Sequence, residues 1–376
     1  MDIYLDNAAT TRVCTEAADI AYKVMTDCYG NPSSTHTKGR DAKAYLDTAR
    51  AQIASALGCS ASEVYFTSCG SESDVWAITR GAESAARRGR HIISSAVEHD
   101  AVRKTLEELE SRGFEVTYLS PEKDGSVSAD AVKAALREDT ILVTLMMVNN
   151  ETGGITDIAA IAKMLKGCGS KALLHTDAVQ GFMKVPFSAK KLGADMISIS
   201  GHKIHAPKGI GALYIKTGVK IKPLIRGGAQ EGGMRAGTEA MPQIAAFGKA
   251  AEIAFSGMKD NCDTMASLRA LAMSTICADI PEAQIIGGGA PHILSVSLPG
   301  WRSEVLMNFL EAEGIYVSRS SACKKGGRSH VLEAMRLPAQ VIDGAIRVSF
   351  SRYNTEDDVL ALCSALKRAH DTLAHR

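Results

Sequence analysis

Two short apolar runs flank a polar turn in the stretch Asp195-Met-Ile-Ser-Ile-Ser-Gly-His-Lys203-Ile-His-Ala-Pro-Lys-Gly-Ile-Gly-Ala-Leu-Tyr-Ile215. The β-branched run at 196–199 predicts a buried strand, and the glycine-rich turn after it leads into a second strand at 212–215. Lys203 is therefore expected just past a strand end, where partial desolvation would lower its pKa and suit its amine to Schiff-base chemistry. Taken alone, the stretch fits an ordinary solvated loop lysine better.

Strands and helices alternate on the N-terminal side of this stretch. Apolar runs predict further strands at 63–67, 91–95, 116–119, 141–148 and 172–176. Helical patterns are expected at 38–57, 74–87, 129–137, 157–166 and 242–256. This rhythm predicts an α/β fold with a mostly parallel sheet, in which ligands bind at the carboxyl ends of the strands.

A smaller α+β unit is expected after the helix at 242–256. Its strands are predicted near 293–297, 317 and 345–349, between helices at 264–278, 303–313 and 331–335 and a last helix from 355. We therefore expect a large domain at 15–256 and a small domain built from 1–14 and 257–376.

Composition excludes several classes of protein. The 376 residues are 45% hydrophobic and carry a formal charge of +1, which gives no electrostatic case for binding nucleic acid or a membrane surface. No run approaches the length of a membrane span and no leader pattern precedes Asp6, so a cytoplasmic protein is expected. The nine cysteines show no Cys-x-x-Cys pair, so we expect no disulfide framework and no metal site, and most cysteines are expected in the core.

Polar groups follow three successive strands of the predicted sheet. The candidate groups are Asn149, Asn150 and Glu151 after the first strand, Asp177 and Gln180 after the second, and Ser200, His202 and Lys203 after the third. A buried Asp177 needs a cationic partner, and a pyridinium N–H would serve, although a helix N-cap explains the residue equally well.

Two earlier segments have the same character. The loop at 68–73 contains Gly70 and Ser71 before a helix, a place where free N–H groups bind anions, although many α/β loops look alike. It lacks the glycine patterns of ATP and NAD sites. His99 begins another helix and fits a cap or core histidine as well as a site residue.

Cys323 lies in the polar, glycine-containing loop Ser318-Arg-Ser-Ser-Ala-Cys-Lys-Lys-Gly-Gly-Arg-Ser329. Lys324, Lys325 and Arg328 supply positive charge that favours a thiolate. Two interpretations of Cys323 remain open at this point: a reactive cysteine and an incidental exposed thiol.

Six motifs in one order make the combination specific. They are Tyr4-Leu-Asp-Asn-Ala-Ala-Thr-Thr, Gly30-Asn-Pro-Ser-Ser, Val148-Asn-Asn-Glu-Thr-Gly, His175-Thr-Asp-Ala-Val-Gln, Ser200-Gly-His-Lys and Ser321-Ala-Cys. Together they closely resemble the cysteine desulfurases, which depend on pyridoxal phosphate and have the class V aminotransferase fold. The resemblance spans Tyr4 to about Asn354. It implies fold type I of the pyridoxal-phosphate transferases, with a seven-stranded sheet in the large domain.

The resemblance also implies a role for each matching residue. Lys203 would hold the cofactor covalently and shuttle protons, Asp177 would pair with the ring nitrogen, and His99 would stack on the ring. Gln180 and Asn150 would contact the ring oxygen, with Asn150 also orienting the substrate. The phosphate would be held by Gly70, Ser71, Ser200, His202 and, from the neighbouring subunit of a homodimer, Thr238. Arg347 would clamp the substrate carboxylate.

The implied reaction converts L-cysteine to L-alanine and leaves a persulfide on Cys323. The sulfur would pass to a protein acceptor for iron–sulfur cluster, thio-cofactor or tRNA sulfur delivery. Two alternatives stay open: a selenocysteine lyase or other class V enzyme, and an idle homologue acting as a binding module. Cys323 argues against an aminotransferase, and the intact set of site residues argues against decay.

The sequence departs from the family's pattern in several places. Cys69 precedes Gly70 and Ser71 where glycine or alanine with threonine is usual, and Gly232 stands where arginine is frequent. The segment after Cys323 is about two residues shorter than in scaffold-feeding members, and the tail after the last helix is missing. We therefore expect a specialised sulfur acceptor.

Overall fold

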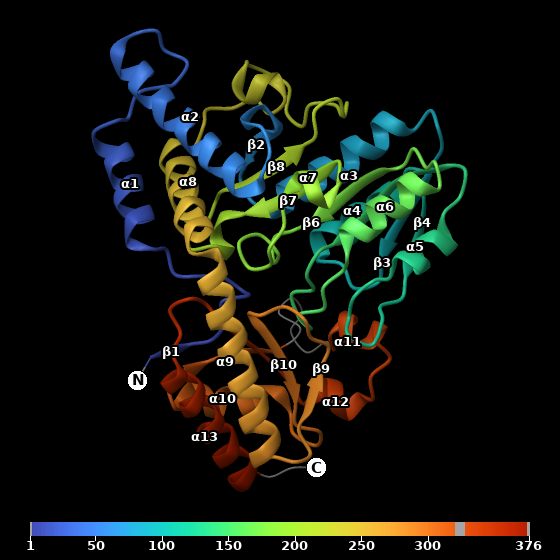
Figure 1. Ribbon diagram of the computed structural model, residues 1–376, viewed down its shortest axis with the longest axis vertical. Helices are drawn as coiled ribbons and strands as arrows, with labels where there is room; N and C mark the ends of the chain where they lie inside the picture. The colour runs from blue at the N-terminus through green and yellow to red at the C-terminus, as the bar shows by residue number, and fades with distance from the viewer. Residues whose placement is uncertain (1, 320–327, 374–376) are drawn as a thin grey trace.

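The computed structural model describes residues 2–319 and 328–373, and a seven-stranded sheet forms the centre of its larger part (Figure 1). The strands are β2 (Val64–Thr67), β3 (His91–Ser95), β4 (Glu115–Leu119), β5 (Thr140–Met146), β6 (Leu173–Asp177), β7 (Met196–Ser200) and β8 (Gly211–Ile215). Their order is β2-β8-β7-β6-β5-β3-β4, and β8 runs antiparallel to both of its neighbours. The other pairs are parallel, which confirms the mostly parallel α/β sheet.

Helices cover both faces of the sheet because successive strand residues point to opposite sides. On one face, α3 (Gly70–Ala85) and α4 (Asp100–Ser111) pack on a core that includes Ile92 and Leu142. The neighbouring Ile93 and Val143 belong to the core of the other face. That face is covered by α5 (Ala129–Ala135), α6 (Ile158–Gly167) and α7 (Ala189–Leu192), with α1 (Thr15–Thr26), α2 (Thr37–Leu57) and α8 (Met241–Ser256) beside them.

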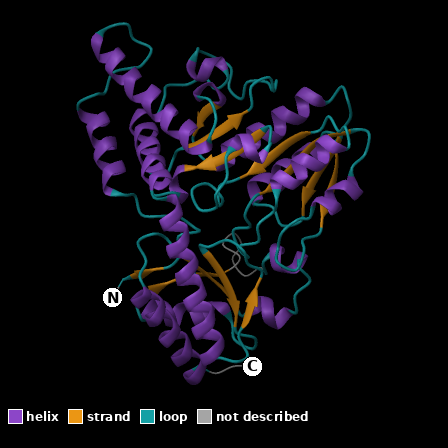
Figure 2. Cartoon of the chain, in the orientation of Figure 1, coloured by secondary structure: helices purple, strands orange, loops and turns teal. Residues whose placement is uncertain are grey.

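A second unit with its own core includes α9 (Met258–Asp279), which follows α8 and runs along this unit (Figures 1 and 2). Its antiparallel sheet has the order β12-β13-β10-β9. The strands are β9 (Gln284–Ile286), β10 (Ile293–Ser297), β12 (Ser318–Arg319) and β13 (Ala345–Ser349). Around it lie α10 (Ser303–Ala312), α11 (His330–Ala334), α12 (Ala339–Asp343) and α13 (Glu356–Thr372).

The N-terminus joins this second unit. Strand β1 (Ile3–Tyr4) pairs in parallel with β11 (Ile315–Tyr316), and Ile3 and Leu5 are buried in the second core. The separate cores support a division near residue 256, and the exact domain bounds stay a prediction. None of the described helices is long and apolar enough to cross a membrane.

Several expectations about local structure are wrong. Helix α3 begins at Gly70 rather than 74, and α9 begins at Met258 rather than 264, because polar first turns hide a helix start from an apolar pattern. Helices α1, α7 and α12 were not predicted. The expectation that most cysteines lie in the core is also wrong: of the eight described, Cys14 and Cys363 are buried, four are intermediate, and Cys168 and Cys277 are exposed.

Candidate active site

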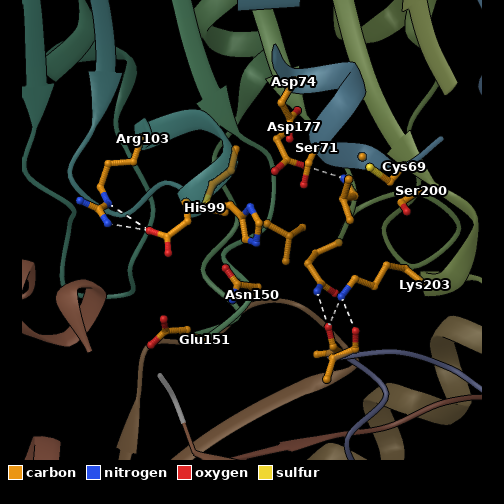
Figure 3. A pocket seen from close by; sticks show the side chains of 18 of the residues that line it. Cys69, Ser71, Asp74, His99, Arg103, Asn150, Glu151, Asp177, Ser200 and Lys203 are labelled. Atoms are coloured by element: carbon orange, nitrogen blue, oxygen red, sulfur yellow. Dashed lines mark hydrogen bonds and ion pairs between the residues drawn. The ribbon is translucent and has the colours of Figure 1, made fainter. Parts of the chain in front are cut away.

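A pocket of about 420 Å³ opens at the carboxyl ends of β5, β6 and β7 (Figure 3). Its lining combines residues from both units and includes most of the predicted site. These residues are Gly70, Ser71, His99, Asn150, Asp177, Gln180, Ser200, His202, Lys203 and Arg347. Thr238 is exposed outside this lining, and Cys323 lies outside the described residues.

Lys203 is the last residue of a short 3₁₀ turn, Gly201–Lys203, that follows β7 directly. Its Nζ donates to the carbonyl oxygens of Ala8 (2.6 Å) and Ala9 (2.7 Å), which come from the N-terminal segment. Burial, followed by the positive charge of Arg347, lowers the pKa of Lys203 to about 8. Lys203 is therefore a pocket side chain with an accessible neutral form, and not a solvated loop lysine.

Asp177 ends β6 and is 6% exposed. Its Oδ1 accepts a hydrogen bond from the Val179 amide at 2.8 Å, and burial raises the pKa of its carboxyl. Turns follow at 179–184 rather than the helix that the cap interpretation required. The side chain therefore orders its own turn and also faces the pocket.

His99 fits both of its interpretations. It is the N-cap of α4, where its Nδ1 accepts a hydrogen bond from the Ala101 amide at 3.1 Å. The same ring points into the pocket between Asn150 and Asp177 (Figure 3). The cap bond fixes the orientation of the imidazole, because it uses one ring nitrogen and leaves the other toward the pocket.

The start of α3 forms a cradle at one end of the pocket. A Cβ on Gly70 would lie 2.6 Å from Val179 Cγ2, so only glycine lets the helix approach the turn after β6 this closely. Ser200 Oγ is buried and has no hydrogen-bond partner among the described residues. His202 Nδ1 lies 3.2 Å from Thr10 Oγ1, and burial lowers the pKa of His202 to about 4. Free amides at a helix start beside an unsatisfied hydroxyl are suited to an anion such as phosphate.

Arg347 reaches the pocket from β13 of the second unit. Its guanidinium donates to the carbonyl oxygen of Asn150 (2.9 Å) and to Asp6 Oδ1 (2.9 Å). Its Nε has no hydrogen-bond partner in the described chain. A carboxylate bound here would therefore meet a cation that is already held in place at two points.

Gln180 is held by neighbours within the chain. Its Nε2 donates to the carbonyl oxygen of Ala8 (2.8 Å), and its Oε1 lies 3.3 Å from His292 Nε2. Both polar atoms of the Gln180 side chain thus have neighbours within the protein, and the contact of Gln180 with a ring oxygen stays a prediction.

Three acidic residues around the pocket were given no role by sequence reasoning, which named only Glu151 of the three among the groups at the strand ends. Asp74 and Glu151 line it, and Glu98 is buried beside it with its Oε1 accepting from the Met146 amide. Burial raises the pKa of Glu98 to about 8 and that of Glu151 to about 7. Glu151 is inside a quoted motif, and Asp74 stands one helical turn after Gly70, which is the available signal for both residues.

The chain matches the family model described as aminotransferase class-V over residues 3–362. It is 43% identical to a cysteine desulfurase IscS of Methanosarcina thermophila, over 95% of this chain and 89% of that protein. It is 44% identical to a cysteine desulfurase of Trichormus azollae, over 95% of this chain and 90% of that protein. A solved NifS-like protein, 38% identical, superposes with a TM-score of 0.94 over 99% of this chain and 100% of that chain. This chain therefore belongs to the class V aminotransferase family, among its cysteine desulfurases.

Proposed function

We propose that the pocket binds pyridoxal phosphate and that Lys203 holds it covalently. The observation that carries this is the placement of Lys203 and Asp177 in one pocket with the buried, unpartnered Ser200 hydroxyl. The residues fit the cofactor: an amine with a pKa of about 8, a buried carboxylate for a ring nitrogen, and an anion cradle at the start of α3. Bound pyridoxal phosphate supplies an electron sink that weakens the bond between Cβ and sulfur of an amino-acid substrate.

Each side chain then has a distinct task. Gly70, Ser71, Ser200 and His202 bind the phosphate, joined by the exposed Thr238 of a second subunit in a homodimer. Asp177 would hold a proton on the ring nitrogen of the bound cofactor, and the His99 ring would cover the cofactor ring. Gln180 and Asn150 orient the ring oxygen. Arg347 binds the substrate carboxylate, and Lys203 moves protons at Cα and Cβ of the substrate.

The substrate is L-cysteine and the sulfur acceptor on the enzyme is Cys323. The Cys323 thiolate attacks the substrate sulfur, an S–S bond forms, and the Cβ–S bond breaks with its electron pair moving to carbon. Protonation of that carbon gives L-alanine, so cysteine and the thiol give alanine and a persulfide without an external oxidant. A protein acceptor in the cytoplasm then takes the sulfur.

The test is a stoichiometric assay on the purified holoenzyme. Incubation with L-cysteine and a thiol reductant should release alanine and sulfide in equal amounts. Cys323→Ala should abolish sulfide release while the protein keeps the absorbance of its bound cofactor, with Cys277→Ala as the exposed-thiol control. Equal turnover by Cys323→Ala would contradict the assignment of Cys323, and failure of the native protein to bind the cofactor would contradict the function itself.

A further inference from the structure

Two buried carboxyl groups lie in the same wall of the pocket. Asp74, on α3, is 1% exposed, and Asp177, at the end of β6, is 6% exposed. Figure 3 shows the two side chains next to one another. Asp177 Oδ1 accepts from the Val179 amide, whereas Asp74 Oδ1 has no hydrogen-bond partner among the described residues. The sequence motifs assign no role to Asp74.

Asp74 has no charged partner in the part of the chain that the structure describes. The basic group within ion-pair distance is His175, whose Nε2 lies 3.7 Å from Asp74 Oδ1. Burial lowers the pKa of His175 to about 3, so this imidazole is neutral near pH 7. The contact is therefore not an ion pair, and an ionised Asp74 would be a buried negative charge without compensation.

A chain of hydrogen bonds runs from this imidazole across the sheet. His175 Nδ1 lies 2.8 Å from Thr144 Oγ1 on β5, and His175 Nε2 lies 2.9 Å from Ser198 Oγ on β7. The Ser198 hydroxyl also acts on Asp74: it lowers the pKa of that carboxyl, against the larger effect of burial, which raises it. A neutral imidazole has one donor and one acceptor nitrogen, so the direction of this chain depends on whether Asp74 carries a proton.

The surrounding charges decide between the two states. Two carboxylates that share a desolvated site do not both ionise easily, because each charge raises the cost of the other. Burial first, and then Asp177, raises the pKa of Asp74 well above its usual value. His99 and Lys203 act in the opposite direction on Asp177: their positive charge stabilises the ionised form of that carboxyl. The titratable groups around the pair are Cys69, Glu98, His99, His175 and Lys203.

We propose that Asp74 is a positioning residue that keeps its proton and donates a hydrogen bond to Ser198, in a chain that continues through His175 to Thr144, leaving Asp177 as the single carboxylate of the pair. The inference rests on the proposed function, because it assigns Asp177 to the cofactor's ring nitrogen. A protonated Asp74 is neutral, so it does not repel the Asp177 carboxylate, which stays ionised and available to that nitrogen. It also holds His175 in the tautomer with its proton on Nδ1.

Infrared spectroscopy of the cofactor-free protein tests the protonation directly. The native protein near pH 7 should show a carboxylic-acid C=O band that Asp74→Asn removes. The matched control is Glu98→Gln, which removes another buried carboxyl with a raised pKa and should leave the Asp74 band in place. An unchanged band in Asp74→Asn overturns the proposal. Ser198→Ala provides a second variant, since breaking the chain should shift the frequency of the Asp74 band, and no shift also counts against it.

Kinetics of the loaded enzyme test the positioning role. Asp74→Asn keeps an N–H donor without a charge, so kcat/KM should stay within about threefold of the native value. Asp74→Ala leaves Ser198 without its partner and should lose about tenfold or more. Equal losses in both variants would show that Asp74 acts as an anion, contrary to the proposal. A native protein without bound cofactor would instead contradict the proposed function, and the infrared result would still stand.

Discussion

The sheet wall of the pocket leaves polar atoms without partners, whereas the wall from the second unit pairs its charged groups. Asp74 Oδ1 and Ser200 Oγ are buried and unsatisfied among the described residues of the sheet wall. On the opposite wall, Arg347 pairs with Asp6 at 2.9 Å and Arg328 pairs with Asp343 at 2.7 Å, so both cations have a carboxylate partner, although the Arg347 Nε has no hydrogen-bond partner among the described residues. The two walls thus differ in what still has to be supplied from outside the chain.

This difference separates ligand binding from assembly of the two units. An unsatisfied buried polar group costs about 1–3 kcal/mol, and the large core beneath the sheet tolerates that cost. The paired wall joins segments distant in sequence, as in Ser329 with Glu151. We infer that the sheet wall is shaped for a bound group, while the paired wall keeps the second unit in position over it. Four variants test this contrast.

Lys203→Ala should have the largest effect. The amine is both the proposed attachment point and the proton carrier, so its loss should lower alanine formation by about 10³-fold or more. Lys203→Arg keeps a cation but no neutral amine near pH 7, and should be equally inactive. Alanine quantification after incubation with L-cysteine gives the result. Activity of Lys203→Ala within tenfold of the native value would show that Lys203 takes no essential part in the reaction.

Arg347→Lys should come second. A lysine cannot reproduce the two-point hold on Asn150 and Asp6 and also offer a planar fork to a substrate carboxylate. We expect kcat/KM for L-cysteine to fall by about 10²-fold, mainly through a higher KM. Arg352→Lys, outside the pocket lining, is the matched control. A loss confined to kcat, with KM unchanged, would argue that Arg347 only joins the two units.

Lys184→Met tests a cation buried behind Lys203. Lys184 is 5% exposed, and its Nζ has no hydrogen-bond partner in the described chain. Burial, followed by Lys203 and Arg347, lowers its pKa from 10.5 to about 7. Between pH 7 and 10.5, Lys184 is protonated in the unfolded chain but largely neutral in the folded protein. Unfolding therefore takes up a proton, and the free energy of unfolding rises with pH by about 1.4 kcal/mol per pH unit at most.

The methionine variant removes that slope. Its stability advantage over the native protein should therefore be largest near pH 7 and shrink as the pH approaches 10. Urea unfolding across this range measures the difference, with Lys190→Met as the exposed control. A difference that does not change with pH would mean that Lys184 finds an acceptor in the folded protein.

Ser329→Ala should have the smallest effect. Ser329 caps α11 by accepting from the Leu332 amide at 3.1 Å, and its hydroxyl also donates to Glu151. Loss of a serine cap costs about 0.5–2 kcal/mol. Ser128→Ala removes the cap of α5, whose hydroxyl has no carboxylate partner among the residues that the structure describes, and should cost less. Equal losses in chemical denaturation would show that the Glu151 contact adds nothing to the paired wall.

The sheet could be predicted from local pattern because buried parallel strands are continuous apolar runs. The run at 196–199 became β7, and the run at 172–176 became β6. The first residues of helices were harder to predict, since the polar first turns of α3 and α9 carry no apolar periodicity. Short helices such as α7 and α12 owe their existence to packing, which a single window of sequence does not contain.

The site divides in the same way. Lys203, Asp177 and Asn150 could be predicted because each follows a strand, and parallel strands end at one edge of a sheet. Asp74 and Lys184 could not, because their significance comes from missing partners. Whether a carboxyl or an ammonium group finds a partner depends on side chains from other elements.

The sequence by itself determined the α/β rhythm, the order of the motifs and the family to which the chain belongs. These properties are local, since apolar periodicity and motif spacing are written along one stretch of chain. Only the tertiary structure decided that the N-terminal carbonyls of Ala8 and Ala9 accept from Lys203, and that Arg347 reaches the same pocket from β13. Burial and charge pairing act through space, so the lowered pKa of Lys203 and the isolation of Asp74 arise only when distant segments pack together.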